Sequence, residues 1–129
     1  MRTGIPASCW CFAATLLAAW GCSRPTETLT AGGKPVTHWI EEAKKPDAKA
    51  RKKAVKELGH VGKADPAAIP VVIHAIKDPD PGVRQEAALA LLNLAPDLPE
   101  AFEPLTEATR DKDAKVREYA TAALARMRR

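Results

Sequence analysis

The sequence predicts an all-α fold built from helical hairpins that stack side by side. One stretch occurs three times, as DAKARKKAVKEL at 47–58, DPGVRQEAALAL at 80–91 and DAKVREYATAAL at 113–124, with equivalent residues 33 positions apart. A fixed period of this size is typical of an array of stacked helix pairs. Composition agrees, because 46% of the residues are hydrophobic but only 5% are aromatic. Alanine and leucine supply most of the apolar surface, which favours closely packed helices.

Residues 1–21 are predicted to be a secretory signal peptide. Arg2 is the only charge before Arg24, and Trp10–Trp20 is an apolar run that ends next to small residues. A short basic start followed by such a run is typical of export signals. The uncharged span 4–23 is also long enough to cross a bilayer, at about 20 residues per span. Three interpretations of this segment are therefore open: a cleaved lipoprotein signal, an ordinary cleaved signal and an uncleaved membrane anchor. Each of them predicts export of the domain that follows.

The segment Ala19–Cys22 resembles the lipobox of bacterial lipoproteins, in which the cysteine is lipidated and becomes the first residue of the mature protein. The resemblance implies that Cys22 carries the lipid. It also implies an exported bacterial lipoprotein, anchored to a membrane on its periplasmic or extracellular side. All three cysteines lie within residues 9–22. The rest of the chain can therefore occupy an oxidising compartment without mispairing.

Residues 22–35 are predicted to form a flexible tether, because SRPTETLTAGGKP is polar, rich in turn residues and without periodicity. The repeat domain follows at 36–129, divided into pairs at about 36–61, 65–95 and 98–129. Cleavage of the leader would remove one basic residue and no acidic one, leaving a mildly positive chain. A net charge this small does not identify a partner.

The second helix of each pair is predicted to begin just after an aspartate. The carboxylate of Asp47, Asp80 or Asp113 can accept hydrogen bonds from the free N–H groups of the first turn, and Pro81 suits the first helical position. Apolar residues follow 3, 7, 11 and 14 positions after the aspartate, which is the spacing of one helical stripe. In the second and third copies these residues are Val83, Ala87, Leu91 and Leu94, and Val116, Ala120, Leu124 and Met127.

A shorter helix is predicted before each of these, at 37–45, 66–77 and 99–110. The second of them has Asp65 in the capping position. Pro70 and Pro104 lie in or just beyond the first turns, so these helices are expected to bend there.

The recurring stretch resembles HEAT repeats, particularly the bacterial HEAT-like class also found in phycobilisome-linker lyases, whose second helix typically opens D-x-x-V-R-x-x-A-x-x-A-L. The middle copy matches best, and the resemblance covers residues 36–128 with departures at Ala50 and Thr121. It implies a right-handed α-solenoid, or superhelix, of about three helix pairs. In such families, aspartates and arginines of successive repeats stack into a ladder of hydrogen-bonded charges. That role would fall to Asp47, Arg51, Asp80, Arg84, Asp113 and Arg117.

The residues that could support chemistry do not form a catalytic pattern. The aspartate and arginine set occurs three times at equal spacing, whereas an enzyme needs its constellation once. His38, His60 and His74 lack metal-ligand spacing, and the only serines, Ser8 and Ser23, lie in or beside the leader. We therefore expect no catalytic residue, no metal, no cofactor and no small-molecule substrate.

The sequence favours a non-enzymatic protein-binding or scaffold module on the cell-envelope side of a membrane. Binding is expected on the concave face lined by the second helices, with candidate contacts at Gln85, Glu86, Glu118 and Tyr119. Because three repeats are near the minimum for a stable array, pairing of its ends with another copy or another repeat protein also stays open.

Two other functions stay open as alternatives. Basic residues form two clusters that could contact nucleic acid or an anionic surface such as lipid headgroups. One consists of Lys44, Lys45, Lys49, Arg51, Lys52, Lys53 and Lys56, and the other of Arg126, Arg128 and Arg129. Interspersed acidic residues and the export signal argue against nucleic acid. A lyase-like enzyme related to phycobilin lyases is less favoured, because the array is short and exported.

Overall fold

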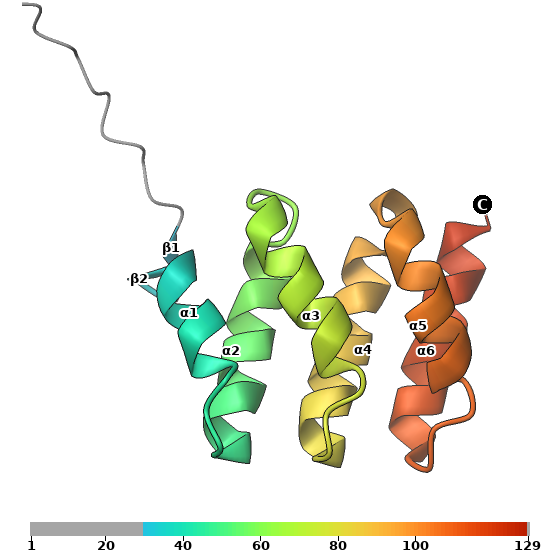
Figure 1. Ribbon diagram of the computed structural model, residues 1–129. Coiled ribbons are helices and arrows are strands. Elements are labelled where there is room, and N and C mark those ends of the chain that lie inside the picture. The colour runs from blue at the N-terminus through green and yellow to red at the C-terminus, as the bar shows by residue number, and fades with distance from the viewer. Residues whose placement is uncertain (1–29, 129) are drawn as a thin grey trace, which may run out of the picture.

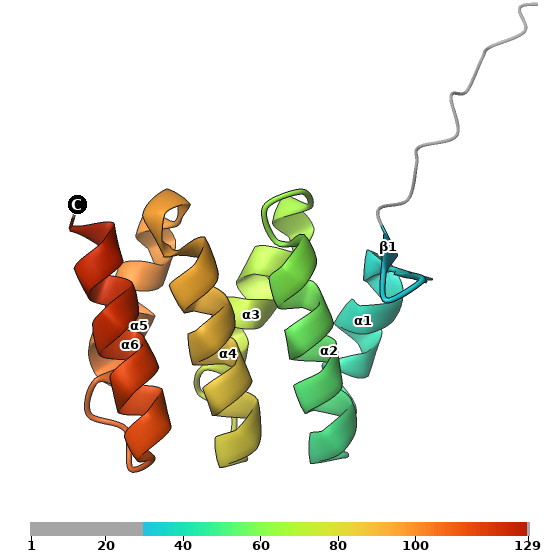
Figure 2. The same cartoon turned by 180° about the vertical axis from the view of Figure 1, so that it is seen from behind.

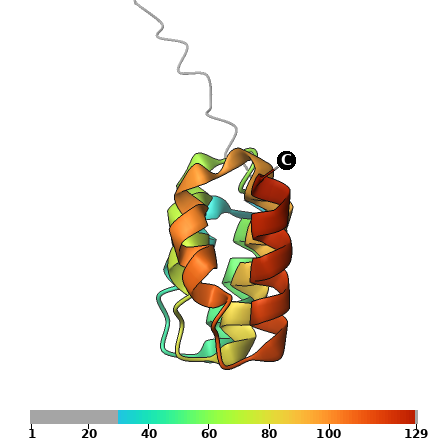
Figure 3. The same ribbon diagram turned by 90° about the vertical axis from the view of Figure 1, so that its right-hand side faces the viewer.

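The computed structural model describes residues 30–128 and shows helix pairs laid side by side (Figure 1). The pairs are α1 (Val36–Glu42) with α2 (Ala48–Val61), α3 (Ile69–Ala75) with α4 (Pro81–Leu94), and α5 (Phe102–Ala108) with α6 (Ala114–Met127). Seen from the end, α1, α3 and α5 form one layer and α2, α4 and α6 the other (Figure 3). The predicted all-α array of helix pairs is confirmed, whereas the signal peptide and Cys22 lie outside the described residues.

In the two later pairs, each shorter first helix begins with a 3-10 segment, and the bends expected at Pro70 and Pro104 stay predictions. A 3-10 helix, Pro66–Ala68, leads into α3, and another, Pro99–Ala101, leads into α5. The Asp65 side chain caps the first of these by accepting from the Ala67 backbone N–H at 2.9 Å. Pro70 lies in the first turn of α3, where a missing N–H breaks no helical hydrogen bond. A third 3-10 helix, Ala95–Asp97, extends α4 towards the last pair.

One continuous core runs through all three pairs. The predicted stripe of α4 is buried, with Val83, Ala87 and Leu91 fully inaccessible, and its equivalents Val116 and Ala120 on α6 are buried in the same way. Helix α4 packs against α2 on one side and α6 on the other. The alanines at the helix contacts allow this close approach, and the leucines one turn later fill the space between helices.

The predicted tether ends earlier than residue 35, because residues 30–35 form a hairpin. Its strands, β1 (Thr30–Ala31) and β2 (Lys34–Pro35), pair antiparallel across Gly32 and Gly33, which have φ values of 54° and 76°. A two-residue hairpin turn with positive φ at both positions strongly favours glycine. Ala31 is buried, and its carbonyl accepts a 2.7 Å hydrogen bond from Trp39 Nε1. The boundary was misplaced because two-residue strands are too short to produce an alternating pattern.

Candidate binding surfaces and the junctions between repeats

Each second helix begins at an aspartate that caps it. Asp80 Oδ1 accepts from the backbone N–H groups of Gly82 and Val83 at 2.8 and 3.1 Å. Asp47 and Asp113 make the equivalent pairs of bonds at the starts of α2 and α6. These carboxylates satisfy N–H groups that have no partner within the helix, so the predicted capping role is confirmed.

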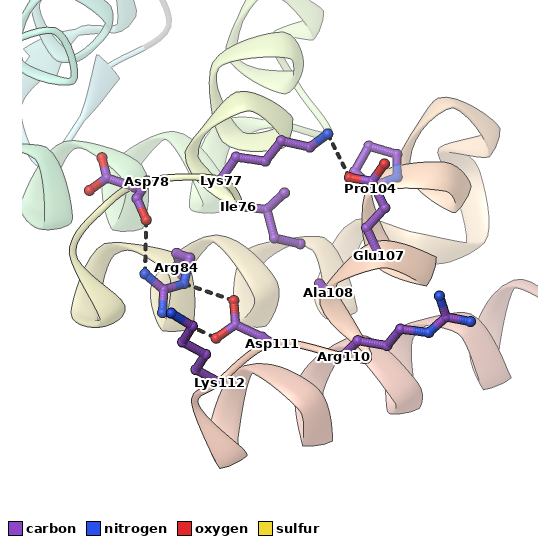
Figure 4. A pocket seen from close by; sticks show the side chains of 10 residues that line it. All are labelled: Ile76, Lys77, Asp78, Arg84, Pro104, Glu107, Ala108, Arg110, Asp111 and Lys112. Atoms are coloured by element: carbon purple, nitrogen blue, oxygen red, sulfur yellow. Dashed lines mark hydrogen bonds and ion pairs between the residues drawn. The ribbon is translucent and has the colours of Figure 1, made fainter.

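The carboxylates that join one repeat to the next belong to different aspartates. Arg51 on α2 donates through Nε and Nη2 to both oxygens of Asp78, at 2.8 and 2.9 Å. Arg84 on α4 makes the same bidentate contact with Asp111, at 2.8 and 3.1 Å (Figure 4). Such paired bonds fix both distance and orientation between the planar groups. The predicted ladder therefore needs correction, since its acidic members are Asp78 and Asp111.

Each capping aspartate uses at least one carboxylate oxygen to accept from the first turn of its own helix, which fixes its side chain over that helix. Asp78 and Asp111 lie two residues earlier, in the turns before α4 and α6, where they face the preceding repeat. The sequence contained a signal for them, because Asp78 and Asp111 are also 33 positions apart. At the equivalent place in the first pair, the chain has Lys45.

The two junction carboxylates are held in their charged form. Partial burial raises the pKa of Asp78, but hydrogen bonds from Arg51 and from the backbone N–H of Asp80 outweigh it, and the pKa lies below the ordinary value of 3.8. Asp111 has a lowered pKa for the same reasons, with Arg84 and the Asp113 N–H as donors. Both therefore remain carboxylates at neutral pH.

The third arginine of the series, Arg117, keeps only half of this arrangement. Its Nη1 donates to the backbone carbonyls of Asp111 and Lys112, both at 2.9 Å. Arg84 Nη1 makes the matching bonds to the carbonyls of Asp78 and Pro79. Among residues 30–128, no carboxylate pairs with Arg117.

The layer formed by α2, α4 and α6 presents one continuous surface, seen from the front in Figure 2. We define the α2/α4/α6 surface by its exposed residues, which are Lys52, Lys56 and His60 on α2, Leu89 and Asn93 on α4, and Glu118, Ala122 and Arg126 on α6. A hollow of 70 Å³ lies between α2 and α4, lined by Lys56, His60, Leu89 and Asn93 among others. Leu89 is 36% exposed beside it, although leucines at core positions of the same helix are buried.

The four predicted partner contacts have different surroundings. Glu118 is exposed, whereas Tyr119 is partly buried and packs against the core. Glu86 lies 3.8 Å from Lys52, so it bridges α4 to α2. Gln85 hydrogen-bonds the Asp113 side chain and helps to lower its pKa, after the larger effect of the Val116 backbone N–H. Glu86 and Gln85 therefore contribute to contacts between repeats, and Glu118 has the most accessible side chain of the four.

The N-terminal basic cluster is partly neutralised. Lys44 pairs with Glu41 at 2.8 Å, and Lys45 pairs with Glu42. Lys53 instead lies over the ring of Trp39, with its Nζ 5.5 Å from the ring centroid. Within this cluster, the exposed Lys49 and Lys56 on α2 form no ion pair among residues 30–128.

Two grooves lie on the opposite layer, at equivalent places in successive pairs. The groove between α3 and α5 has a volume of 370 Å³ and is bridged by Lys77 and Glu107 at 2.6 Å (Figure 4). The groove between α1 and α3, of 250 Å³, has Lys44 and His74 in these places and a more apolar lining. The Lys77–Glu107 ion pair crosses the α3/α5 groove, so this groove is part of the junction between the second and third pairs.

Within the described part of the chain, no three histidine, cysteine, aspartate or glutamate side chains are grouped as a metal site would require. None of the helices between residues 30 and 128 is both long and apolar enough to cross a membrane.

Comparison with known proteins identifies the family. Residues 36–125 match the family model for HEAT repeats, which covers well over half of the chain. A search of curated proteins found no match. The matched range begins at α1 and ends within α6, so it contains all three helix pairs. The chain belongs to the HEAT repeat family.

Proposed function

We propose that this protein is a non-enzymatic binding and scaffold module, anchored to a bacterial envelope membrane through a lipid on Cys22. HEAT repeats generally mediate protein–protein interaction, which supports the binding role. The N-terminal sequence supports the anchor, because it combines an apolar leader with a cysteine in lipobox context. The contact surface in this proposal is the α2/α4/α6 surface.

The observation that carries the proposal is a division between positions that repeat and positions that vary. Two core positions of the second helices contain the same residue in every pair, which are Ala54, Ala87 and Ala120 at one place and Leu58, Leu91 and Leu124 at the other. Equivalent positions on the α2/α4/α6 surface contain unlike residues, which are Lys56, Leu89 and Ala122 at one place and His60, Asn93 and Arg126 at another. Stacking requires the first set to be uniform and leaves the second set free to match a partner.

The surface has a defined chemical character. Its α2 edge is basic, through Lys52 and Lys56, and its centre contains the exposed side chain of Leu89. A partially exposed leucine beside a small hollow suits an apolar anchor residue, while charges at the edge mainly set orientation and association rate. The partner that fits is a protein with an apolar residue flanked by acidic ones.

Site-specific photo-crosslinking tests the surface. A photoreactive residue at position 89 is expected to form a defined crosslinked product in intact envelopes. The same residue at position 103, where Glu103 is exposed on α5 in the opposite layer, provides the control. Equal yields of the same product from both positions would contradict the assignment of the surface.

Mass spectrometry of the N-terminal peptide tests the anchor. The lipoprotein hypothesis predicts a peptide that begins at Cys22 and has the added mass of acyl chains, which is lost in Cys22→Ser. Two acyl chains would hold the protein durably, because each buried CH₂ contributes about 0.8 kcal/mol. An unmodified Cys22, whether the leader is cleaved or retained, would rule out the lipid anchor and leave the binding surface to be judged by crosslinking alone.

A further inference from the structure

The two ends of the solenoid differ in whether another element covers the outermost helix pair. At the N-terminal end, the hairpin of β1 and β2 covers the first pair, with Ala31 buried and bonded to Trp39. At the other end, α6 packs against α4 and α5 but against no later helix among residues 30–128 (Figure 1). Within residues 30–128, the outer face of α6 therefore has no covering element of the kind that the hairpin provides for the first pair.

Two junctions inside the chain show what such a continuation would bring. In each, one edge of an arginine is fixed by Nη1 bonds to two backbone carbonyls of its own repeat. The other edge, Nε and Nη2, then receives a carboxylate from the turn of the next repeat. These side chains are largely covered, with Arg51 14% and Arg84 15% exposed.

Arg117 has the first half of this arrangement and is exposed. Its Nη1 bonds to the carbonyls of Asp111 and Lys112 orient the guanidinium as in the two internal junctions. The side chain is exposed, and no carboxylate among the described residues meets its Nε and Nη2 edge. Because the orientation is already fixed, a carboxylate arriving here loses less freedom than it would at a mobile arginine.

We propose that the α6 end of the solenoid is a docking surface for a helical pair of another protein, which places an aspartate or glutamate from its inter-helix turn against Arg117. Charge complementarity and the two internal templates define this occupant. This contact goes beyond the proposed function, since it lies at the end of the array and apart from the α2/α4/α6 surface.

The last pair is polar at two positions that are buried and apolar in earlier pairs. Thr121 is exposed at the place where Val55 and Ala88 are buried in the earlier pairs, and Thr109 replaces the buried Ile76. A polar face supports reversible association, because little apolar surface is left uncovered when the partner leaves. Docking here is therefore expected to depend on the Arg117 pair more than on burial.

A second copy of this chain is a poor occupant in the same geometry. The residue equivalent to Asp78 in its first pair is Lys45, which would place two cations together. The hairpin also covers part of the face that would have to approach. The occupant must therefore have an acidic residue where this chain has Lys45.

NMR observation of the arginine Nε–H groups tests the site. The probe is acetyl-Asp-Pro-Asp-amide, which has the sequence of residues 78–80. The Arg117 signal is expected to shift at a roughly fivefold lower concentration than that of exposed Arg110, corresponding to about one additional net hydrogen bond. Parallel shifts of Arg117 and Arg110 would overturn the proposal. So would an Arg117 signal that already matches those of Arg51 and Arg84 before peptide is added.

A chain extended by one repeat tests whether the end accepts a helical pair. Residues 96–128 are duplicated after Arg128, which places a copy of Asp111 in register with Arg117. Arg117→Gln is expected to lower the Tm of the extended chain by several degrees and to change that of the original chain much less. Equal effects in both chains would contradict docking at this end.

Light scattering distinguishes the occupants. The original chain and Arg117→Gln are both expected to be monomeric over the concentrations used for NMR. A dimer that Arg117→Gln abolishes would overturn the assignment to a different protein and show self-association instead.

Discussion

Replacing Leu91 by alanine tests whether the three pairs form one interdependent stack. Leu91 is fully buried on α4, which packs against both α2 and α6. The change removes three carbons, at about 0.8 kcal/mol each, and leaves a cavity that two flanking helices cannot easily close. We expect Leu91→Ala to lower the free energy of unfolding by about 3–4 kcal/mol, a large part of the roughly 5–15 kcal/mol typical of a domain.

Two matched substitutions serve as controls for the loss of stability in Leu91→Ala. Leu124→Ala on α6 should cost about 2 kcal/mol, because this position is 8% exposed and has a neighbouring pair on one side only. Leu89→Ala, on the same helix as Leu91 but 36% exposed, should change stability by about 0.5 kcal/mol or less. Urea unfolding followed by circular dichroism measures all three. A Leu91→Ala variant no less stable than Leu89→Ala would refute the stacking argument.

The remaining predictions concern one close contact, one charge and one hydrogen bond. A Cβ on Gly59 would lie 2.6 Å from the Cβ of Ala90. Gly59→Ala should therefore destabilise the fold by about 1 kcal/mol, in spite of the better helix propensity of alanine. In a double-mutant cycle, Ala90→Gly should remove that penalty. Because the pKa of Asp78 is lower in the folded chain than its ordinary value of 3.8, its stabilisation is present above that pH and lost as pH falls through the folded pKa. Asp78→Asn should therefore lower Tm at pH 7 and differ progressively less from the original chain in a pH series down to 2.5; a constant difference would contradict this. Trp39→Phe removes the hydrogen bond to the Ala31 carbonyl and should speed amide hydrogen exchange in residues 30–35. It should also lower the free energy of unfolding by about 0.5–1.5 kcal/mol. Unchanged exchange would show that this bond does not hold the hairpin.

The sequence was sufficient for features that depend on local chemistry repeated three times. The capping aspartates and the apolar stripe through Leu91 follow from short-range rules, and the structure contains both. The family resemblance, noted from the recurring stretch, is confirmed over residues 36–125.

Features that depend on contacts between repeats were harder to predict. The pairing of Arg51 with Asp78 spans 27 residues, and no local rule distinguishes that aspartate from the capping Asp80 two positions later. The hairpin was missed because its strands are very short, and its place depends on the Trp39 side chain eight residues away. The open edge of Arg117 becomes visible only by comparison with the two complete junctions.

The central claim is that repeating positions build the stack while varying positions bind the partner. The most direct measurement is a paired comparison of Tm and of the crosslinking yield from a photoreactive residue at Lys56, in Leu89→Glu and in Asp78→Asn. We expect Leu89→Glu to leave Tm nearly unchanged and to abolish the crosslink, whereas Asp78→Asn lowers Tm and leaves the crosslink intact below the transition. The reverse pattern, or loss of the crosslink in both variants while each remains folded, would contradict it.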